Sequence, residues 1–389
     1  MATLSGELFF TQDDGVHGVE LWKTNGTPGQ EVLIKDLCPG ACGSHPKALT
    51  RVGSRLVFFA NDGEHGFEPW ATDGTAAGTS LIADLWPGTV GGGDSRWMLE
   101  MGGAVYFSGN DRIHGLELWK TDGTAAGTAL VADLRPGPES SLPVPKVTSG
   151  GLLLLNADDG IHGREPWLTD GTAAGTHLVK DVNPGIEGST YLEPPFGGSN
   201  DWLATSGGMF LFQAQDGTHG LELWASDGTE DGTVLLRDFY AGSVGGYPTE
   251  LTELAGTVYF SVATDTQGYE LWRTDGTSAG TSLVREVHPG SLGSGPQRLA
   301  VSSGRLFFRA ATDAAGYELW TSDGTEAGTT LVKDIRPGTQ GSLLFHDPAL
   351  TDLAGTLYFF ADDGVNGLEI WKSDGTEAGT TLVTDFSGQ

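Results

Sequence analysis

The segment Glu369-Ile370-Trp371-Lys372-Ser373-Asp374-Gly375-Thr376 decides the fold of this chain, because near-copies of it recur along the whole sequence. The tryptophans of the eight copies are Trp22, Trp70, Trp119, Trp167, Trp224, Trp272, Trp320 and Trp371. Successive tryptophans are 48, 49, 48, 57, 48, 48 and 51 residues apart. A period this regular indicates one structural unit repeated eight times, and such units are stable only when neighbours bury each other's apolar faces. We therefore expect the 389 residues to form a single domain.

Each unit has the composition of four short strands. In the last unit, residues 348–353, 357–361, 368–372 and 381–385 are rich in β-branched and aromatic residues, and Gly-rich turns separate them. Such residues favour a pleated sheet, and no segment shows the period of a helix. The pattern predicts an all-β fold, an eight-bladed β-propeller with four antiparallel strands in each blade.

The chain begins in the first strand of a unit and ends in the fourth strand of the last one. We therefore predict contiguous blades without a swapped strand, and a ring that closes by packing the first blade on the eighth. The expected blades are residues 1–38, 45–86, 95–135, 143–183, 200–240, 247–288, 295–336 and 347–386. An open solenoid of stacked units is the alternative architecture.

The net charge of -30 argues against nucleic acid and anionic membranes as partners. Of the 51 acidic residues, 31 occupy four repeated positions, so most of the charge belongs to the scaffold. No segment approaches the length of a membrane span, so we predict no membrane insertion, and we expect a monomer. We recognise no signal peptide, because the first residues already resemble part of a repeat.

Two cysteines, Cys38 and Cys42, lie four residues apart in one loop. A disulfide formed in an oxidising compartment is the favoured interpretation. Two free thiols are the alternative, and a zinc site would need two further ligands nearby.

The segment Glu117-Leu118-Trp119-Lys120-Thr121-Asp122-Gly123-Thr124 resembles the ELWxxDGT repeat of bacterial, often myxobacterial, surface and secreted proteins. The resemblance covers the whole chain, with Pro69 and Pro166 in place of Leu and Asn25 in place of Asp. It implies a propeller and an extracellular, cell-surface or periplasmic location, and it implies no reaction. A weaker similarity connects the chain to the quinoprotein alcohol dehydrogenases, but their adjacent cysteine pair is absent and the order of motif and turn differs.

Three repeated carboxylates of each unit are expected at one edge of its sheet, and in the last unit they are Asp363, Glu369 and Asp385. Adjacent strands lie about 4.8 Å apart, so the three side chains could converge on one cation. Oxygen ligands suit calcium, so Ca²⁺ is the predicted metal at these residues and their equivalents. The alternative is that each carboxylate accepts hydrogen bonds from N–H groups of its own turn.

Five histidines occupy equivalent places in the motif Asp-Gly-x-His-Gly and its near copy at residues 111–115. They are His17, His65, His114, His162 and His219. We interpret them as hydrogen-bonding turn residues rather than catalytic bases.

Specificity for one ligand requires residues that the repeats do not share. The longest unshared segment, residues 186–202, contains Tyr191, Phe196 and Trp202, which we expect in an exposed loop. A variable position in the first strand of each unit holds Lys146, Glu250 and Arg298. The predicted binding site lies on the top face over the central channel and consists of these three aromatic residues, these three charged residues, His162 and His219. The alternatives are that the aromatic residues fill the channel and that the charged residues pair with one another.

No catalytic motif is recognisable. The sequence therefore favours a secreted or cell-surface propeller that binds a small molecule, a glycan or a protein. An enzyme with His346 and Asp347 among its catalytic residues is one alternative, and a passive surface module is another.

Overall fold

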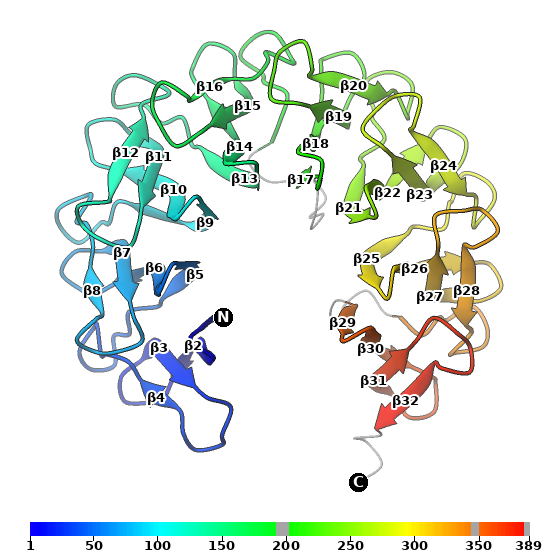
Figure 1. Cartoon of the computed structure of the whole chain (residues 1–389), viewed down its shortest axis with the longest axis horizontal. Coiled ribbons are helices and arrows are strands. Elements are labelled where there is room, and N and C mark those ends of the chain that lie inside the picture. The colour runs from blue at the N-terminus through cyan, green and yellow to red at the C-terminus, as the bar shows by residue number, and fades with distance from the viewer. Residues whose placement is uncertain (192–201, 344–349, 385–389) are drawn as a thin grey trace. The chain divides into compact units, whose positions relative to one another are not determined.

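The computed structural model describes residues 1–191, 202–343 and 350–384 (Figure 1). Within them the strands β1 to β32 form eight sheets of four strands, and each sheet consists of four strands consecutive in the sequence. Neighbouring strands are antiparallel throughout. The predicted all-β class, the four antiparallel strands of each repeat and the absence of swapped strands in these sheets are confirmed.

The first compact unit, Met1–Leu192, contains four sheets. The strands of its first two sheets are β1 (Ala2–Leu4), β2 (Glu7–Asp13), β3 (Val19–Thr24), β4 (Val32–Leu33), β5 (Lys47–Val52), β6 (Arg55–Asn61), β7 (Phe67–Thr72) and β8 (Ser80–Leu81). The third and fourth sheets contain β9 (Gly93–Met101), β10 (Ala104–Asn110), β11 (Leu116–Thr121), β12 (Ala129–Ala132), β13 (Val144–Ser149), β14 (Leu152–Asp158), β15 (Arg164–Thr169) and β16 (His177–Leu178).

The second unit, Glu193–Gln389, also contains four sheets. The fifth and sixth sheets contain β17 (Trp202–Ala204), β18 (Phe210–Ala214), β19 (Glu222–Ser226), β20 (Val234–Arg237), β21 (Thr249–Leu254), β22 (Thr257–Thr264), β23 (Gly268–Thr274) and β24 (Ser282–Arg285). The seventh and eighth contain β25 (Gln297–Ser302), β26 (Arg305–Thr312), β27 (Gly316–Ser322), β28 (Thr330–Lys333), β29 (Thr351–Leu353), β30 (Thr356–Asp362), β31 (Leu368–Ser373) and β32 (Thr381–Thr384). In the last sheet the observed strands agree closely with the expected ones, except that residues 348 and 349 lie outside the described part.

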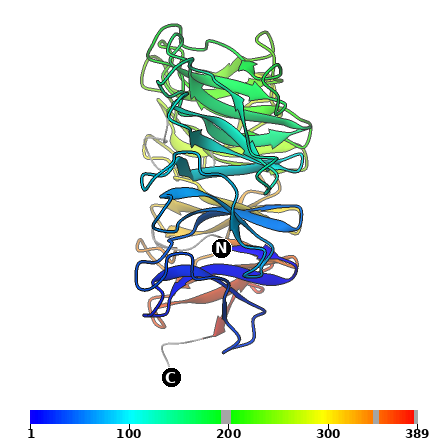
Figure 2. The ribbon, with the colours of Figure 1, turned by 90° about the vertical axis from the view of Figure 1, so that its left-hand side faces the viewer.

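In the second to seventh sheets the second strand is buried along most of its length because both of its faces are covered. In β6 the residues from Leu56 to Ala60 are all fully buried. Within the first unit, Phe9 and Leu21 of the first sheet pack against Phe58 of the second. Figure 2 shows the sheets of this unit as successive layers of the ribbon. Burial of apolar surface against a neighbouring sheet is what makes these short strands stable.

The motif tryptophan lies between consecutive sheets. Trp70 is 6% exposed and packs in one cluster with Phe9 and Leu21 of the preceding sheet. The same arrangement within a unit holds for Trp167, Trp272, Trp320 and Trp371. Trp22, in the first sheet, is only partly buried.

The Asp-Gly-Thr turn that follows the tryptophan docks on the preceding sheet. In the second sheet Asp73 Oδ1 accepts hydrogen bonds from the N–H of Thr75 at 2.9 Å and from its Oγ1 at 2.7 Å. Gly74 has φ +91°, and a Cβ there would lie 3.0 Å from Phe9 Cζ. Glycine is therefore required both by the left-handed backbone and by the close contact.

Basic side chains also reach these turns from the preceding sheet. Lys120 Nζ donates to the carbonyl of Gly171 at 2.8 Å, and Arg273 Nη1 donates to that of Gly324 at 2.9 Å. Within a unit the motif thus joins a sheet to its predecessor by apolar packing, and at Gly171 and Gly324 a charge-assisted hydrogen bond is added.

Two further features concern the chain as a whole. Cys38 and Cys42 form a disulfide, as predicted. No helix in the described ranges is long and apolar enough to cross a membrane.

Candidate functional site

In six of the eight described sheets, one edge carries two loops that interlock through glycines. In the fourth sheet a Cβ on Gly163 would lie 2.5 Å from the N of Gly188, and a Cβ on Gly188 would lie 2.2 Å from the N of Arg164. The first glycine belongs to the Asp-Gly-x-His-Gly loop, and the second belongs to the loop that leads out of the sheet. Because their backbones are in direct contact, the two loops form one platform, which we call the loop edge of the sheet.

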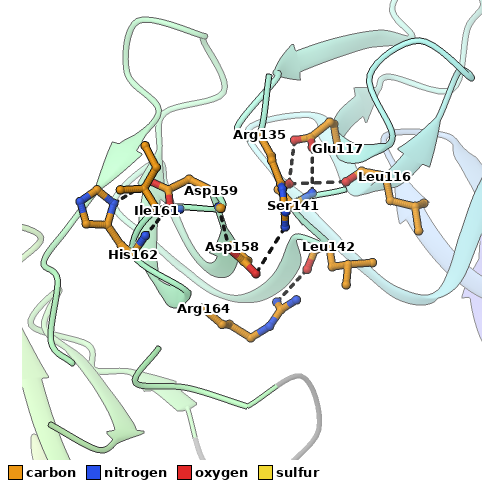
Figure 3. Close-up of polar contacts among 11 residues, drawn as sticks. Leu116, Glu117, Arg135, Ser141, Leu142, Asp158, Asp159, Ile161, His162 and Arg164 are labelled. Carbon is orange, nitrogen blue, oxygen red and sulfur yellow. Dashed lines mark hydrogen bonds and ion pairs between the residues drawn. The ribbon is translucent and has the colours of Figure 1, made fainter. Parts of the chain in front are cut away.

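The histidines of the loop edge are held by aspartates of their own turns, as we interpreted them. Asp159 Oδ1 accepts hydrogen bonds from the N–H groups of Ile161 at 2.9 Å and His162 at 2.8 Å. Asp159 Oδ2 lies 2.7 Å from Nδ1 of His162 (Figure 3). The same 2.7 Å contact recurs at His17, His65, His114 and His219. This hydrogen bond raises the pKa of each histidine above its usual value of 6.5.

The glutamate two residues before the tryptophan is a buried acceptor for the outgoing loop. Glu117 is fully buried, and its carboxylate accepts hydrogen bonds from the N–H of Leu134 at 2.9 Å, the N–H of Ser141 at 2.9 Å and the Oγ of Ser141 at 2.7 Å (Figure 3). Hydrogen bonds of this kind recur at Glu20, Glu68, Glu165, Glu222, Glu270 and Glu318. Burial raises the pKa of Glu117 to about 7, although its hydrogen-bond donors act in the opposite direction.

These hydrogen bonds bear directly on the predicted calcium ligands. Asp363 accepts hydrogen bonds from the N–H groups of Val365 and Asn366 and from Nδ2 of Asn366. The glutamates equivalent to Glu369 are hydrogen-bonded as Glu117 is, while Asp385 lies outside the described residues. The described part of the chain contains no group of three His, Cys, Asp or Glu residues that could hold a metal ion. Bonding to N–H groups of its own turn, the alternative to calcium, is therefore observed for Asp363, whereas the glutamates accept from the outgoing loop. Calcium binding stays a prediction.

Trp202 corrects the expectation that the long unshared segment ends in an exposed aromatic residue. It begins β17, is 8% exposed and stacks on Phe212 of β18, with ring centroids 5.0 Å apart and an interplanar angle of 18°. Its ring thus contributes to the core of the fifth sheet. Tyr191 is exposed, as expected, and its carbonyl accepts a hydrogen bond from Nδ2 of Asn156 at 3.0 Å. Phe196, His346 and Asp347 lie outside the described residues.

In four sheets the variable position in the first strand lies at a β-bulge. The register of β21 shifts between Thr249 and Thr252, and Glu250 between them has φ +63°. Likewise the register of β25 shifts between Gln297 and Ala300, and Arg298 has φ +60°. Lys146 lies at a register shift in β13 of the first unit. The sequence singled out these positions by their variability, but it carried no signal of the bulge.

Glu250 and Arg298 are the two predicted site residues that the structure places on neighbouring strands. Both belong to the second unit, where β21 and β25 contact each other, and both side chains are partly exposed. Across the described residues, neither side chain makes a hydrogen bond or an ion pair. The expected alternative, that these charges pair with one another, is thus not observed. Lys146, His162 and Tyr191 belong to the first unit, and His219 belongs to the second.

Neither a protein-family model nor a curated protein matches this chain. Among solved structures, one from a study of two prolyl endopeptidases is similar with 13% identity and a TM-score of 0.46, over 87% of this chain and 49% of that one. A puromycin hydrolase has 15% identity and a TM-score of 0.38, over 87% and 54% of the two chains. Oligopeptidase B from Leishmania major has 11% identity and a TM-score of 0.43, over 92% and 52%. The chain spans about half the length of these proteins.

Removing the buried acceptor should destabilise the protein strongly. Glu117→Ala leaves three buried donors without a partner, and each such donor destabilises by about 1–3 kcal/mol. We expect the free energy of unfolding, measured by urea denaturation, to fall by at least about 3 kcal/mol. Glu139→Ala, at an exposed glutamate of the same loop, is the control and should change little. Equal effects of the two substitutions would contradict this role for Glu117.

The histidine turns predict a pH dependence with a natural control. The folded pKa of His162 is raised, so its contribution to stability is fully present below pH 6.5 and is lost as the pH rises through the folded pKa. Asn366 makes the same contact to Asp363 at 2.7 Å without titrating. His162→Asn should therefore match the wild type at pH 8 and be less stable at pH 5.5, by under about 1 kcal/mol because solvent screens the pair. Asn366→His should match the wild type at pH 8 and be more stable than it at pH 5.5, as measured by urea denaturation at the two pH values. If the stability difference from the wild type did not change with pH in either variant, the argument would be refuted.

Proposed function

We propose that this chain is a ligand-binding β-propeller domain, with its site at the bulges that carry Glu250 and Arg298. The observation that carries the proposal is that two opposite charges lie on neighbouring strands and form no ion pair or hydrogen bond with each other. The site would take a small molecule or a glycan, or the side chains of a protein partner. Glu250 and Arg298 follow the outgoing loops of the loop edge in the sequence, which supports the proposed location on the top face.

A comparison within the chain separates the charges from the fold. Ala48 has φ +54° at the same bulge of the second sheet, where the register of β5 shifts between Lys47 and Thr50. The left-handed backbone therefore forms without a charged side chain. For a residue other than glycine this conformation is unfavourable, by about 1–2 kcal/mol. Because Ala48 shares this conformation, the strain belongs to the scaffold, and the unpaired charge is what distinguishes Glu250 and Arg298.

We also propose the finer architecture that the repeat predicts, one closed eight-bladed propeller in which the first sheet packs on the eighth. In the preceding sheets of each unit, the next Asp-Gly-Thr turn covers the second and third strands. On the eighth sheet the corresponding place is a hollow of about 360 Å³ lined by Thr356, Lys372 and Asp374, among others. In the first sheet a Cβ on Gly26 would have no described atom within 4 Å, unlike one on Gly74. The uncovered turn of the first sheet and the unfilled hollow on the eighth sheet support ring closure, because the turn would fill the hollow.

We propose further that the chain is exported from the cytoplasm. The Cys38–Cys42 disulfide supports it, because disulfides persist mainly in oxidising compartments such as the periplasm and the cell exterior. We propose an extracellular, cell-surface or periplasmic location on this ground and on the resemblance described above.

The binding proposal is tested by native mass spectrometry against a panel of monosaccharides, uronic acids and amino acids. A ligand found for the wild-type protein should bind the double variant Glu250→Ala/Arg298→Ala at least about tenfold more weakly, because removing a charged partner is costly. Lys372→Ala, on the eighth sheet, is the control and should bind as the wild type does. Full affinity in the double variant would place the site elsewhere, and no binding across the panel would count against the function.

Ring closure is tested by comparing two tryptophans. Trp70→Ala removes a side chain buried against the preceding sheet and should lower the free energy of unfolding by about 3–5 kcal/mol. If the ring closes, Trp22 is equally covered, and Trp22→Ala should produce a loss of the same size in urea denaturation. A loss for Trp22→Ala well under half of that for Trp70→Ala would favour an open array.

A further inference from the structure

We infer that the site at Glu250 and Arg298 recognises a zwitterion, of which a free α-amino acid is the simplest example. The inference rests on the proposed binding function and names the chemical class of its ligand. A carboxylate of the ligand would pair with the guanidinium of Arg298, and an ammonium group would pair with the carboxylate of Glu250.

The chemistry of the two side chains selects this class. A guanidinium presents a planar fork of N–H donors that matches a carboxylate with two parallel hydrogen bonds. An ionised carboxylate only accepts hydrogen bonds, and an ammonium group only donates them. A ligand with both groups therefore satisfies both side chains, whereas a neutral sugar leaves the charge of each without a counter-charge.

The charge of the whole protein points the same way. At a net charge of -30 the chain repels anions over long distances, so a ligand that is only anionic is disfavoured before it reaches Arg298. A zwitterion carries no net charge and avoids this repulsion. A purely cationic ligand would be attracted, but it would meet Arg298 as a like charge.

Both bulges are anchored by buried side chains, which hold the chain beside Glu250 and Arg298 in place before a ligand arrives. Nε2 of Gln213, a buried residue of β18, donates to the carbonyl of Pro248, two residues before Glu250. Arg309, a buried residue of β26, donates through Nε to Oε1 of Gln297 at 3.2 Å, directly before Arg298. Preorganisation of this kind reduces the entropy lost on binding.

The experiment is isothermal titration of the full chain with glycine, L-leucine and L-glutamine, each also as its N-acetyl derivative and its methyl ester. At least one free amino acid should bind saturably at millimolar concentration or below. Its N-acetyl derivative lacks the ammonium and its ester lacks the carboxylate, so each should bind at least about tenfold more weakly. Glu250→Gln should weaken binding of the free amino acid but leave binding of the N-acetyl derivative unchanged. Arg298→Gln should weaken binding of the free amino acid but leave binding of the methyl ester unchanged.

Galactose and galacturonate serve as the comparison arms. If either sugar binds and the double variant Glu250→Ala/Arg298→Ala abolishes that binding, the proposed function stands and the zwitterion class is overturned. If no free amino acid binds, or if its derivatives bind as well as it does, the class is also overturned. The two single variants and the double variant should keep the far-UV circular dichroism and melting temperature of the wild type, since Ala48 already adopts the same bulge.

Discussion

The buried glutamate of each motif is the interaction on which the rest of the structure depends. A loop that leaves a sheet and enters the next must satisfy its N–H groups away from water, and an orphaned buried donor destabilises the fold. In the third sheet Glu117 accepts from Ser141, and the carbonyl of Ser141 in turn accepts from the N–H of Asp158 in the fourth sheet at 2.9 Å. One loop residue therefore joins two sheets. The same relay runs through Ser44, Gly92, Gly246 and Ser294.

This role explains why the motif combines residue types that have little in common. The glutamate fixes the loop to the next sheet, the tryptophan packs on the previous sheet, and the Asp-Gly-Thr turn docks there through its glycine. A unit of four short strands has little stability of its own. By placing contacts to both neighbours within eight residues, the motif makes each sheet dependent on the sheets around it.

Much of the fold could be predicted from the sequence because the features that determine it are local and repeated. The period of the tryptophans, the Gly-rich turns and the β-branched runs predicted β30, β31 and β32 within a residue or two. The disulfide followed from the four-residue spacing of Cys38 and Cys42 in one loop. The function of Glu117 did not follow, since a carboxylate at a strand end suits a cation as well as a backbone N–H. Trp202 was misplaced for a similar reason, because only the register with Phe212 shows that its ring is covered.

The candidate site was predictable as a set of variable positions but not as a geometry. A β-bulge depends on how two strands pair, and the residue types in β21 and β25 do not predict it. Once the bulges are known, however, the repeat provides its own comparison. Ala48, Glu250 and Arg298 share one backbone conformation and differ only in side chain, so the conformation belongs to the scaffold and the charges do not. In a chain built from near-identical sheets, a side chain that the fold does not require and that no neighbour neutralises is where recognition can differ from one sheet to the next.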